Sequence, residues 1–369
     1  MQSAGALGRL ALPHRPRRPR THFSRRGGPA CRTPLRRSPG GAVTLMNTLP
    51  RRLLTLPLLA LATVLMVASL PLWLPLMALL ALVHPGARAA PRVMAFFTLY
   101  LLCESAGVLA AAWLWLRYPT HGPAFLEANY GLQSWWASTL KNGAERLFRL
   151  RFEVTGTEAF DGAEAPLVLP RHSSMGDTVL PVVFFAIPTG NRLRYVLKRE
   201  LLFDPCLDIV GQRLPNYFAR RGAGATEQEV AGVVSLLKDL PRHHGLLLYP
   251  EGTRFSEGKR QAVLARLQEK GDGEALARAE GWPGLLPPRP GGLRGVLAHN
   301  PGRDLLMLAH RGFEQSASFA QLFNGSWLDT TVKLHFWRVP FAAIPRDPSA
   351  HASFIYDLWD AMQAKLDTL

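Results

Sequence analysis

No acidic side chain precedes Glu104 in this chain of 369 residues. The formal net charge is +16, from 43 Lys and Arg against 27 Asp and Glu. Residues 1–52 hold twelve Arg and no Lys, whereas the chain from Glu104 onward holds 29 basic and 27 acidic side chains. The positive excess therefore belongs to the N-terminal end, and we predict that nucleic acid is not a partner of the main body of the protein.

Cysteine is also scarce. The three cysteines, Cys31, Cys103 and Cys206, are odd in number, far apart and without CxxC or Cys/His spacing. Neither a disulfide framework nor a structural zinc site is indicated. We predict no bound metal and no cofactor, and a reducing compartment fits this cysteine usage best.

The segment 1–52 is rich in Arg and Pro and, with Phe23 as an exception, lacks aromatic side chains that stack on bases. Residues 1–45 show no helical or alternating apolar period, so we predict disorder. Three meanings remain open: a tail that binds a membrane surface or nucleic acid, an organelle transit peptide, or a stretch upstream of the true start at Met46. We favour the third, and recovery of peptides from residues 1–45 of the native protein would contradict it.

Two long apolar runs follow. Residues 53–83 contain no charged side chain, and residues 93–116 contain only Glu104. Both exceed the roughly 20 residues that cross the hydrocarbon of a bilayer, so we predict a membrane-associated helical hairpin over residues 53–117. The prolines of the first run leave open whether it spans, kinks or re-enters. Glu104 is either a functional intramembrane acid or, as we favour, a carboxyl that faces protein or the membrane interface.

Charged residues flank the two runs. Arg51 and Arg52 precede them and Arg117 follows them. If both runs span, the positive-inside tendency places both flanks on the cytoplasmic side, which for a bacterial protein is the cytoplasmic face of the inner membrane. The first run is too long and starts too late for a secretory signal peptide.

From residue 118 onward, short apolar runs alternate with helical patterns. This alternation predicts an α/β domain over residues 118–369, with a mixed, largely parallel sheet flanked by helices. Residues 259–280 are charged and helix-prone, so we expect a surface insertion there. The predicted strands are residues 166–170, 195–197, 246–249 and 332–337.

A first candidate constellation follows the strand-like run 166–170. His172 and Asp177 are separated by four residues, with Gly176 between them. A strand-to-helix turn at this glycine can fold the carboxylate back onto the imidazole, where it fixes the tautomer and stabilises the imidazolium. His172 is then a candidate general base, although a hydrogen-bonded pair without catalytic function has the same spacing.

A second constellation, Pro250-Glu251-Gly252-Thr253-Arg254, follows the run 246–249. Ligands bind at strand ends in α/β sheets. Arg254 offers a bidentate fork for phosphate, Gly252 permits close approach of the backbone, and Glu251 is placed to orient Arg254 or a substrate hydroxyl. The alternative is a capped turn with a surface ion pair. A P-loop is excluded by its wrong spacing and by Arg260 in place of Ser or Thr.

Together the two constellations resemble the His-x4-Asp and Pro-Glu-Gly-Thr-Arg blocks of the glycerolipid acyltransferases, the 1-acylglycerol-3-phosphate acyltransferase family. The resemblance covers roughly residues 150–340. Between the blocks, residues 198–201 are similar to the family's Lys-x-Glu-Leu stretch, and residues 211–221, which end in Arg220 and Arg221, are loosely similar to a third block. Residues 287–292 (Pro-Pro-Arg-Pro-Gly-Gly) resemble a Leu-Pro-Arg-x-x-Gly segment of the branch with long-chain acceptors.

The resemblance implies a membrane-bound O-acyltransferase whose partners are a phospholipid membrane, a lysophospholipid acceptor and an acyl thioester donor. His172, assisted by Asp177, is expected to act as general base on the free hydroxyl of an acceptor such as lysophosphatidic acid. The donor is acyl-CoA or acyl carrier protein, as a co-substrate. Arg254, with Arg220 or Arg221, is expected to hold the acceptor's phosphate, in a substrate-binding set that also includes Glu251, Gly252 and Thr253.

Other functions use the same residues differently. A CoA-independent phospholipid transacylase would share His172 and Asp177, and an assay without acyl-CoA separates it. A membrane-anchored, non-catalytic protein that binds anionic lipid or nucleic acid would depend on residues 1–45. A serine hydrolase would use Ser173 or Ser174, but no G-x-S-x-G elbow is present, and we expect these serines to cap a helix.

Overall fold

The computed structural model describes residues 41–84, 87–220 and 226–369, of which Thr48–Leu369 form one compact unit. The expectations for residues 1–40, and for Arg221 as a phosphate ligand, lie outside the described residues. The helices are α1 (Gly41–Ala68), α2 (Leu70–Val83), α3 (Ala90–Arg117), α4 (Pro123–Phe148), α5 (Ile187–Thr189), α6 (Pro205–Arg213), α7 (Glu227–Ser235), α8 (Glu257–Glu269), α9 (Gly273–Glu280), α10 (Pro290–Ala298) and α11 (His351–Thr368).

One seven-stranded sheet forms the centre of the domain, in the order β1-β7-β6-β2-β5-β3-β4. All neighbouring strands are parallel except β6 and β7, which are antiparallel. The predicted mixed, largely parallel sheet is therefore confirmed. The strands are β1 (Arg151–Thr155), β2 (Leu167–Pro170), β3 (Arg192–Lys198), β4 (Tyr217–Ala219), β5 (His244–Leu247), β6 (Leu305–Arg311) and β7 (Thr331–Val339).

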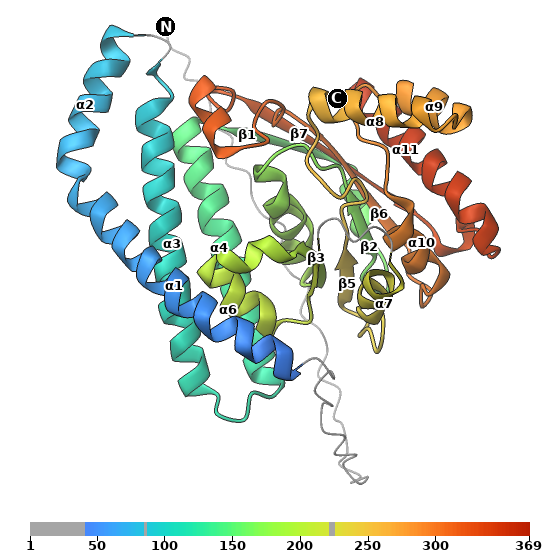
Figure 1. The fold of residues 1–369 in the computed structure, drawn as a ribbon, viewed down its shortest axis with the longest axis horizontal. Coiled ribbons are helices and arrows are strands. Elements are labelled where there is room, and N and C mark those ends of the chain that lie inside the picture. The colour runs from blue at the N-terminus through green and yellow to red at the C-terminus, as the bar shows by residue number, and fades with distance from the viewer. Residues whose placement is uncertain (1–40, 85–86, 221–225) are drawn as a thin grey trace, which may run out of the picture. The chain divides into compact units, whose positions relative to one another are not determined.

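Helices cover both faces of the sheet, with α3 and α4 on one side and α7, α10 and α11 on the other (Figure 1). The central strands β2 and β5 are buried at every position because alternate side chains enter different cores. In β2, Val168 packs in the core that contains Phe148 of α4, whereas Leu167 and Leu169 pack in the core that contains Trp359 of α11. The charged segment after residue 256 forms α8 and α9, and no residue of α8 is buried.

The first apolar run is divided into two helices, α1 and α2, at Ser69. Pro71 lies in the first turn of α2, where its missing N–H needs no partner, and it favours a new helix start at this point. The run therefore kinks. Helix α1 begins at Gly41, so residues 41–45, which we predicted to be disordered, belong to a helix. The segment 1–52 that we set apart as Arg/Pro-rich therefore ends inside α1.

Buried ion pairs fix the start of the apolar helices to α6. Arg51 Nη2 and Arg52 Nε lie 2.6 and 2.7 Å from the two carboxylate oxygens of Asp208, whose side chain is fully buried. The positive charges that flank the first run therefore have a partner within the protein.

In the middle of α3, the Glu104 carboxylate accepts hydrogen bonds from Trp136 Nε1 at 2.7 Å and from the backbone N–H of Cys206 at 3.1 Å. Glu104 thus faces protein.

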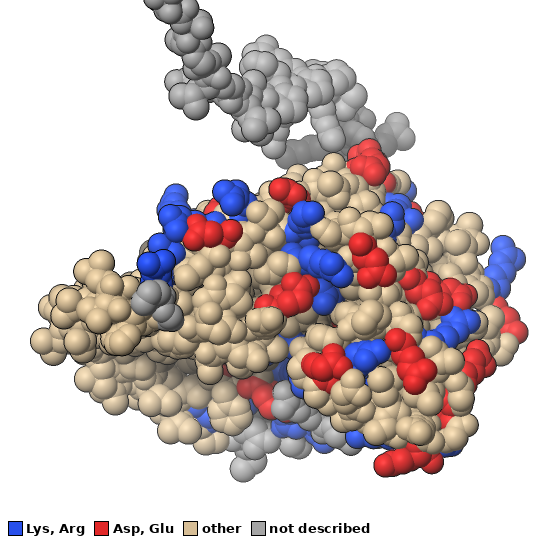
Figure 2. Space-filling view, turned by 90° about the horizontal axis from the view of Figure 1, so that it is seen from above, with Lys and Arg blue, Asp and Glu red and all other residues tan. Residues whose placement is uncertain are grey.

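The opposite surface of these helices is apolar and exposed. Among the described residues, Thr48–Ala68 and Ala90–Arg117 are each long and apolar enough to cross a membrane, and only 6% of the apolar window of the first is buried within the protein. Leu72 and Leu82 of α2 are 76% and 83% exposed. In Figure 2, the left side of the molecule, where α1–α3 lie, carries few charges, and Lys, Arg, Asp and Glu gather towards the right.

Candidate functional site

Two neighbouring parallel strands bring the sequence-predicted constellations together. β2 ends at Pro170 and pairs in parallel with β5, which ends at Leu247. Since parallel strands end at the same edge of a sheet, the segments that follow them meet there. The two segments are joined directly: the backbone N–H of Phe255 donates a hydrogen bond of 2.7 Å to the carbonyl oxygen of His172.

His172 and Asp177 form the expected pair. His172 Nδ1 lies 3.0 Å from Asp177 Oδ1, and the two residues are 6% and 0% exposed. A proton on Nδ1, donated to the carboxylate, leaves Nε2 as the nitrogen that can accept a proton. The ring also packs against Tyr249, with 4.4 Å between ring centroids, so its orientation is fixed on two sides.

The second oxygen of Asp177 organises the loop that carries the histidine. Asp177 Oδ2 accepts hydrogen bonds from the backbone N–H groups of Ser173 and Ser174 at 2.6 and 2.8 Å. Burial alone would raise the pKa of Asp177, but the charge and hydrogen bond of His172, with further contributions from His310 and the backbone, hold this pKa below its ordinary value. The carboxylate is therefore kept ionised beside the imidazole.

Glu251 occupies a place different from the one we expected. Its side chain is buried, and its two carboxylate oxygens accept hydrogen bonds from the backbone N–H groups of His172 at 2.6 Å and Leu286 at 3.0 Å. Burial raises the pKa of Glu251 to about 8, and the two N–H bonds oppose that rise. The residue therefore holds the His172 loop in place, and the expectation that it orients Arg254 or a substrate hydroxyl is corrected.

The rest of the second constellation forms a turn beside this carboxylate. Gly252 has φ +67°, a left-handed conformation that favours glycine. Thr253 Oγ1 accepts a hydrogen bond of 3.2 Å from Lys259 Nζ, at the start of α8. The guanidinium of Arg254 donates a hydrogen bond from Nη1 to the carbonyl oxygen of Ala317. These three residues lie at the same sheet edge as His172.

Arg220 follows the edge strand β4, and β5 and β3 lie between β4 and β2. Its side chain is exposed, and its backbone N–H donates a hydrogen bond of 3.2 Å to Glu229 Oε2. Since β4 is parallel to β3, Arg220 lies at the sheet edge where His172 lies, but not next to it. Its expected contact with phosphate stays a prediction.

The serines between His172 and Asp177 have local structural roles in the described residues. Ser174 Oγ accepts a hydrogen bond of 3.0 Å from the N–H of Gly176, the first residue of a 3-10 turn, and lies 2.8 Å from Ser316 Oγ. Ser173 donates its backbone N–H to Asp177. The side chain of Ser174 therefore stabilises the start of the turn, whereas the buried hydroxyl of Ser173 has no hydrogen-bond partner among the described residues and does not cap it.

The sequence patterns missed two buried residues next to the pair. His310, in β6, is fully buried, and its Nε2 lies 3.2 Å from the carbonyl oxygen of Arg171 and 3.7 Å from Asp177 Oδ2. Arg171 Nη1 contacts Glu314 Oε1 at 2.6 Å. A histidine at the end of the apolar run 305–309 is the only sequence signal that could have pointed to this strand.

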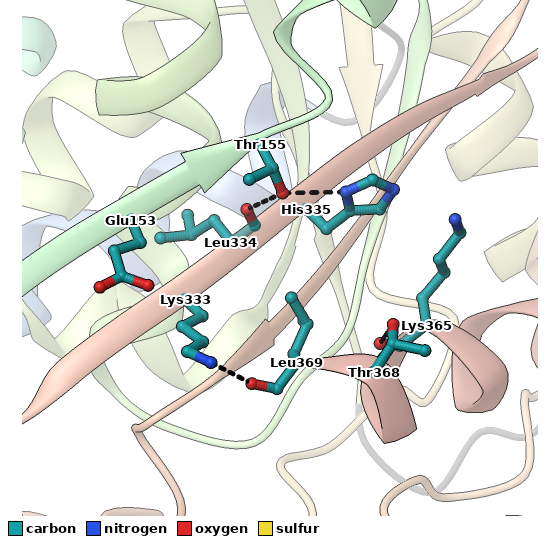
Figure 3. Close-up of a pocket in the computed structure, with 8 residues that line it drawn as sticks. All are labelled: Glu153, Thr155, Lys333, Leu334, His335, Lys365, Thr368 and Leu369. Carbon is teal, nitrogen blue, oxygen red and sulfur yellow. Dashed lines mark hydrogen bonds between the residues drawn. The ribbon is translucent and has the colours of Figure 1, made fainter.

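A surface depression of about 280 Å³ lies elsewhere, between β1, β7 and the C-terminal end of α11 (Figure 3). Its walls include Lys333, whose Nζ donates to the carbonyl oxygen of Leu369 at 2.7 Å, and Thr155, whose Oγ1 lies 2.9 Å from His335 Nδ1. None of the sequence-predicted site residues lines it. We therefore do not place substrate binding there.

Within the described residues, one group of possible metal ligands brings its ligand atoms within 4.8 Å of one another: Glu127, His243 and His244. The two histidines precede or begin β5, at the sheet edge opposite to His172. Glu127 is ion-paired with Arg192 at 2.9 Å. This group is separate from the candidate active site and has no part in its chemistry.

Two comparisons with known proteins find similar proteins. The model of the acyltransferase family matches residues 151–293. The chain is similar in structure to the 1-acyl-sn-glycerophosphate (LPA) acyltransferase PlsC from Thermotoga maritima, with a TM-score of 0.51 and 14% sequence identity over 78% of this chain and 100% of that chain. Comparison with curated proteins gives no match. Residues 151–293 therefore resemble the acyltransferase family, and the chain has the fold seen in PlsC, a mostly parallel sheet flanked by helices.

Proposed function

We propose that this protein transfers a fatty acyl group from an acyl thioester, acyl-CoA or acyl carrier protein, to the free hydroxyl of a lysophospholipid such as lysophosphatidic acid. The observation that carries the proposal is the 3.0 Å contact between His172 Nδ1 and Asp177 Oδ1 at the sheet edge of an acyltransferase domain. No cofactor or metal takes part in the proposed reaction.

The proposed reaction begins with a proton transfer. Nε2 of His172 takes the proton of the acceptor hydroxyl while the alkoxide oxygen attacks the carbonyl carbon of the thioester. A C–O ester bond forms and the C–S bond breaks, and the imidazolium returns its proton to the departing thiolate. Asp177 stabilises the imidazolium during the transfer, because the carboxylate charge lies within hydrogen-bond distance of Nδ1.

Arg254 is the proposed ligand for the acceptor's phosphate within the second constellation. A guanidinium presents five N–H donors in a planar fork, a geometry that suits the oxygens of a phosphate. Gly252 and Thr253 shape the turn that carries it. Arg220 is a second proposed cation, at the same sheet edge but farther along it.

We propose that α1–α3 attach the enzyme to the membrane from which the acceptor enters. Their exposed leucines supply the apolar surface, while the contacts of Asp208 and Glu104 hold the helices against the α/β domain. Because α3 contacts α4 and α6 at its middle, these helices fit insertion into one leaflet better than two separate spans. The proposed location is the cytoplasmic face, a reducing environment that fits the free thiols of Cys103 and Cys206.

The test is an acyl-transfer assay in detergent with the full-length protein, lysophosphatidic acid and labelled acyl-CoA. We expect the wild-type chain to form diacyl product and the His172→Ala variant to lose it, with an unchanged circular dichroism spectrum. His299→Ala, which changes an exposed histidine at the end of α10, serves as the control. Turnover by His172→Ala at the wild-type rate would overturn the mechanism, and product formed without acyl-CoA would point to transacylation.

A further inference from the structure

The segment 286–289 is attached to the second constellation at both of its ends. The backbone N–H of Leu286 donates to Glu251 Oε2 at 3.0 Å, and the backbone N–H of Arg289 donates to the carbonyl oxygen of Pro250 at 2.8 Å. On its other side, the carbonyl oxygen of Leu286 accepts a hydrogen bond of 3.0 Å from Trp359 of α11. The position of Arg289 is therefore fixed relative to the candidate site.

The side chain of Arg289 lies over Gly252. A Cβ atom at Gly252 would come within 2.9 Å of Arg289 Cδ and 3.2 Å of its Nε, so glycine at this position leaves the space that the stem of the arginine occupies. Arg289 is the N-cap residue of α10, and its side chain is exposed. The guanidinium is thus presented to solvent beside the turn of Glu251, Gly252 and Arg254.

Arg289 and Arg254 differ in the partners of their guanidinium groups. The guanidinium of Arg254 is held within the protein, where Nη1 donates a hydrogen bond to the carbonyl oxygen of Ala317. Arg289 forms no side-chain hydrogen bond or ion pair with the part of the chain that the structure describes, and the nearby carboxylate of Glu251 is occupied by two backbone N–H groups. An exposed guanidinium anchored by its stem and backbone is suited to bind phosphate through its fork.

We propose that Arg289 binds a phosphate group of a substrate, next to the site of acyl transfer. This inference rests on the proposed function and adds a binding residue to it. Both proposed substrates carry phosphate, the acceptor as a phosphomonoester and the donor in the CoA moiety, so either one offers the group that Arg289 would bind. The side chain of Arg289 lies over Gly252, which has a left-handed conformation, and Arg254 follows this glycine by two positions. The two arginines form a phosphate-binding pair that draws its members from two distant stretches of the sequence.

The experiment compares Arg289→Met, which keeps an apolar stem over Gly252, with Arg289→Lys, which keeps the charge and loses the fork. Arg294→Met, an exposed arginine one and a half turns further along α10, is the matched control. We expect the KM of the phosphate-bearing substrate to rise about ten-fold in Arg289→Met and less in Arg289→Lys, as for the loss of one charged hydrogen-bonded contact. The control should keep the wild-type KM.

Two arms distinguish the source of the phosphate. In the first, lysophosphatidic acid is compared with monoacylglycerol, which has no phosphate. In the second, acyl-CoA is compared with the acyl thioester of N-acetylcysteamine, which also has none. A rise confined to lysophosphatidic acid assigns Arg289 to the acceptor, and a rise confined to acyl-CoA assigns it to the donor. Unchanged KM values for both, or an equal rise in Arg294→Met, would overturn the proposal.

A binding measurement separates this inference from the proposed function. If the wild-type chain does not transfer acyl groups, the proposed function fails. The role of Arg289 in phosphate binding is then tested by equilibrium binding of lysophosphatidic acid and of CoA to the full-length protein. About ten-fold weaker binding of either ligand by Arg289→Met supports the role of Arg289 in the absence of turnover. Equal binding by wild type and variant overturns it.

Discussion

Glu251 Oε1 accepts a hydrogen bond of 2.6 Å from the backbone N–H of His172, 79 residues earlier in the chain. The other oxygen of the same carboxylate accepts the N–H of Leu286. One buried side chain therefore joins the loop after β2, the turn after β5 and the segment that leads to α10. The geometry of the candidate general base depends on a residue that does not touch its ring.

The first prediction concerns this carboxylate. In Glu251→Gln, one oxygen is replaced by an NH2 group, which cannot accept a hydrogen bond from a backbone N–H. A buried donor is left without a partner, at a cost of about 1–3 kcal/mol. We expect a lower thermal midpoint and a reduced kcat, and no change in Glu269→Gln, whose side chain is exposed on α8. A Glu251→Gln protein with wild-type melting and turnover would contradict the positioning role.

The second prediction concerns the partner of the imidazole. Asp177→Asn removes the charge beside His172 Nδ1 and puts an amide group where both oxygens now accept hydrogen bonds. Since general acid–base catalysis contributes about 100-fold or more, we expect kcat to fall by at least that factor, with little change in KM. Steady-state kinetics measure it, with the exposed Asp161→Asn as control. A fall in affinity alone would argue against the pair.

The third prediction compares a buried with an exposed ion pair. Asp208→Asn leaves Arg51 and Arg52 without their carboxylate, and we expect a loss of about 3–5 kcal/mol in the free energy of unfolding. Asp329→Asn breaks the exposed pair with Arg149 and should cost about 0–1 kcal/mol. Chemical denaturation in detergent measures both. Equal effects of the two variants would show that Asp208 does not fix the apolar helices.

The fourth prediction concerns pH. Burial lowers the pKa of His310 from 6.5 to about 4, against the opposing charge of Asp177. Between these values His310 binds a proton in the unfolded chain but not in the folded protein. The contribution of His310 to the free energy of unfolding therefore falls as the pH drops from about 6.5 towards 4. His244, whose pKa burial also lowers to about 4, contributes in the same direction.

The check is the thermal midpoint at pH 7.5 and pH 5.0. Between pH 7.5 and 5.0 the midpoint of the wild type should shift more in the destabilising direction than that of His310→Gln, which does not titrate at this position. Glu251, whose pKa is raised to about 8, contributes in the opposite direction in both proteins. The titration of His244 still contributes to the pH dependence of stability in the His310→Gln variant. The same change of the thermal midpoint between pH 7.5 and 5.0 in both proteins would exclude His310 as a source of the pH dependence.

The sequence predicted the class of fold and the paired blocks of the site. The four predicted strands lie within or next to β2, β3, β5 and β7, because buried strands leave short apolar runs with turn signals around them. β1, β4 and β6 were not among the predicted strands. β1 is half exposed and polar, and β4 has three residues, so neither produces a clear apolar run.

The spacing of His172 and Asp177, five positions apart, was visible in the sequence, since a single loop brings them together. The roles of Glu251, Asp208 and His310 were not, because their partners lie 79 to 157 residues away along the chain. Such contacts depend on which strands are neighbours and which helices cover the sheet. The sequence by itself determined the chemical groups of the site, and only the tertiary structure decided which of them meet at one edge of the sheet and which hold the backbone.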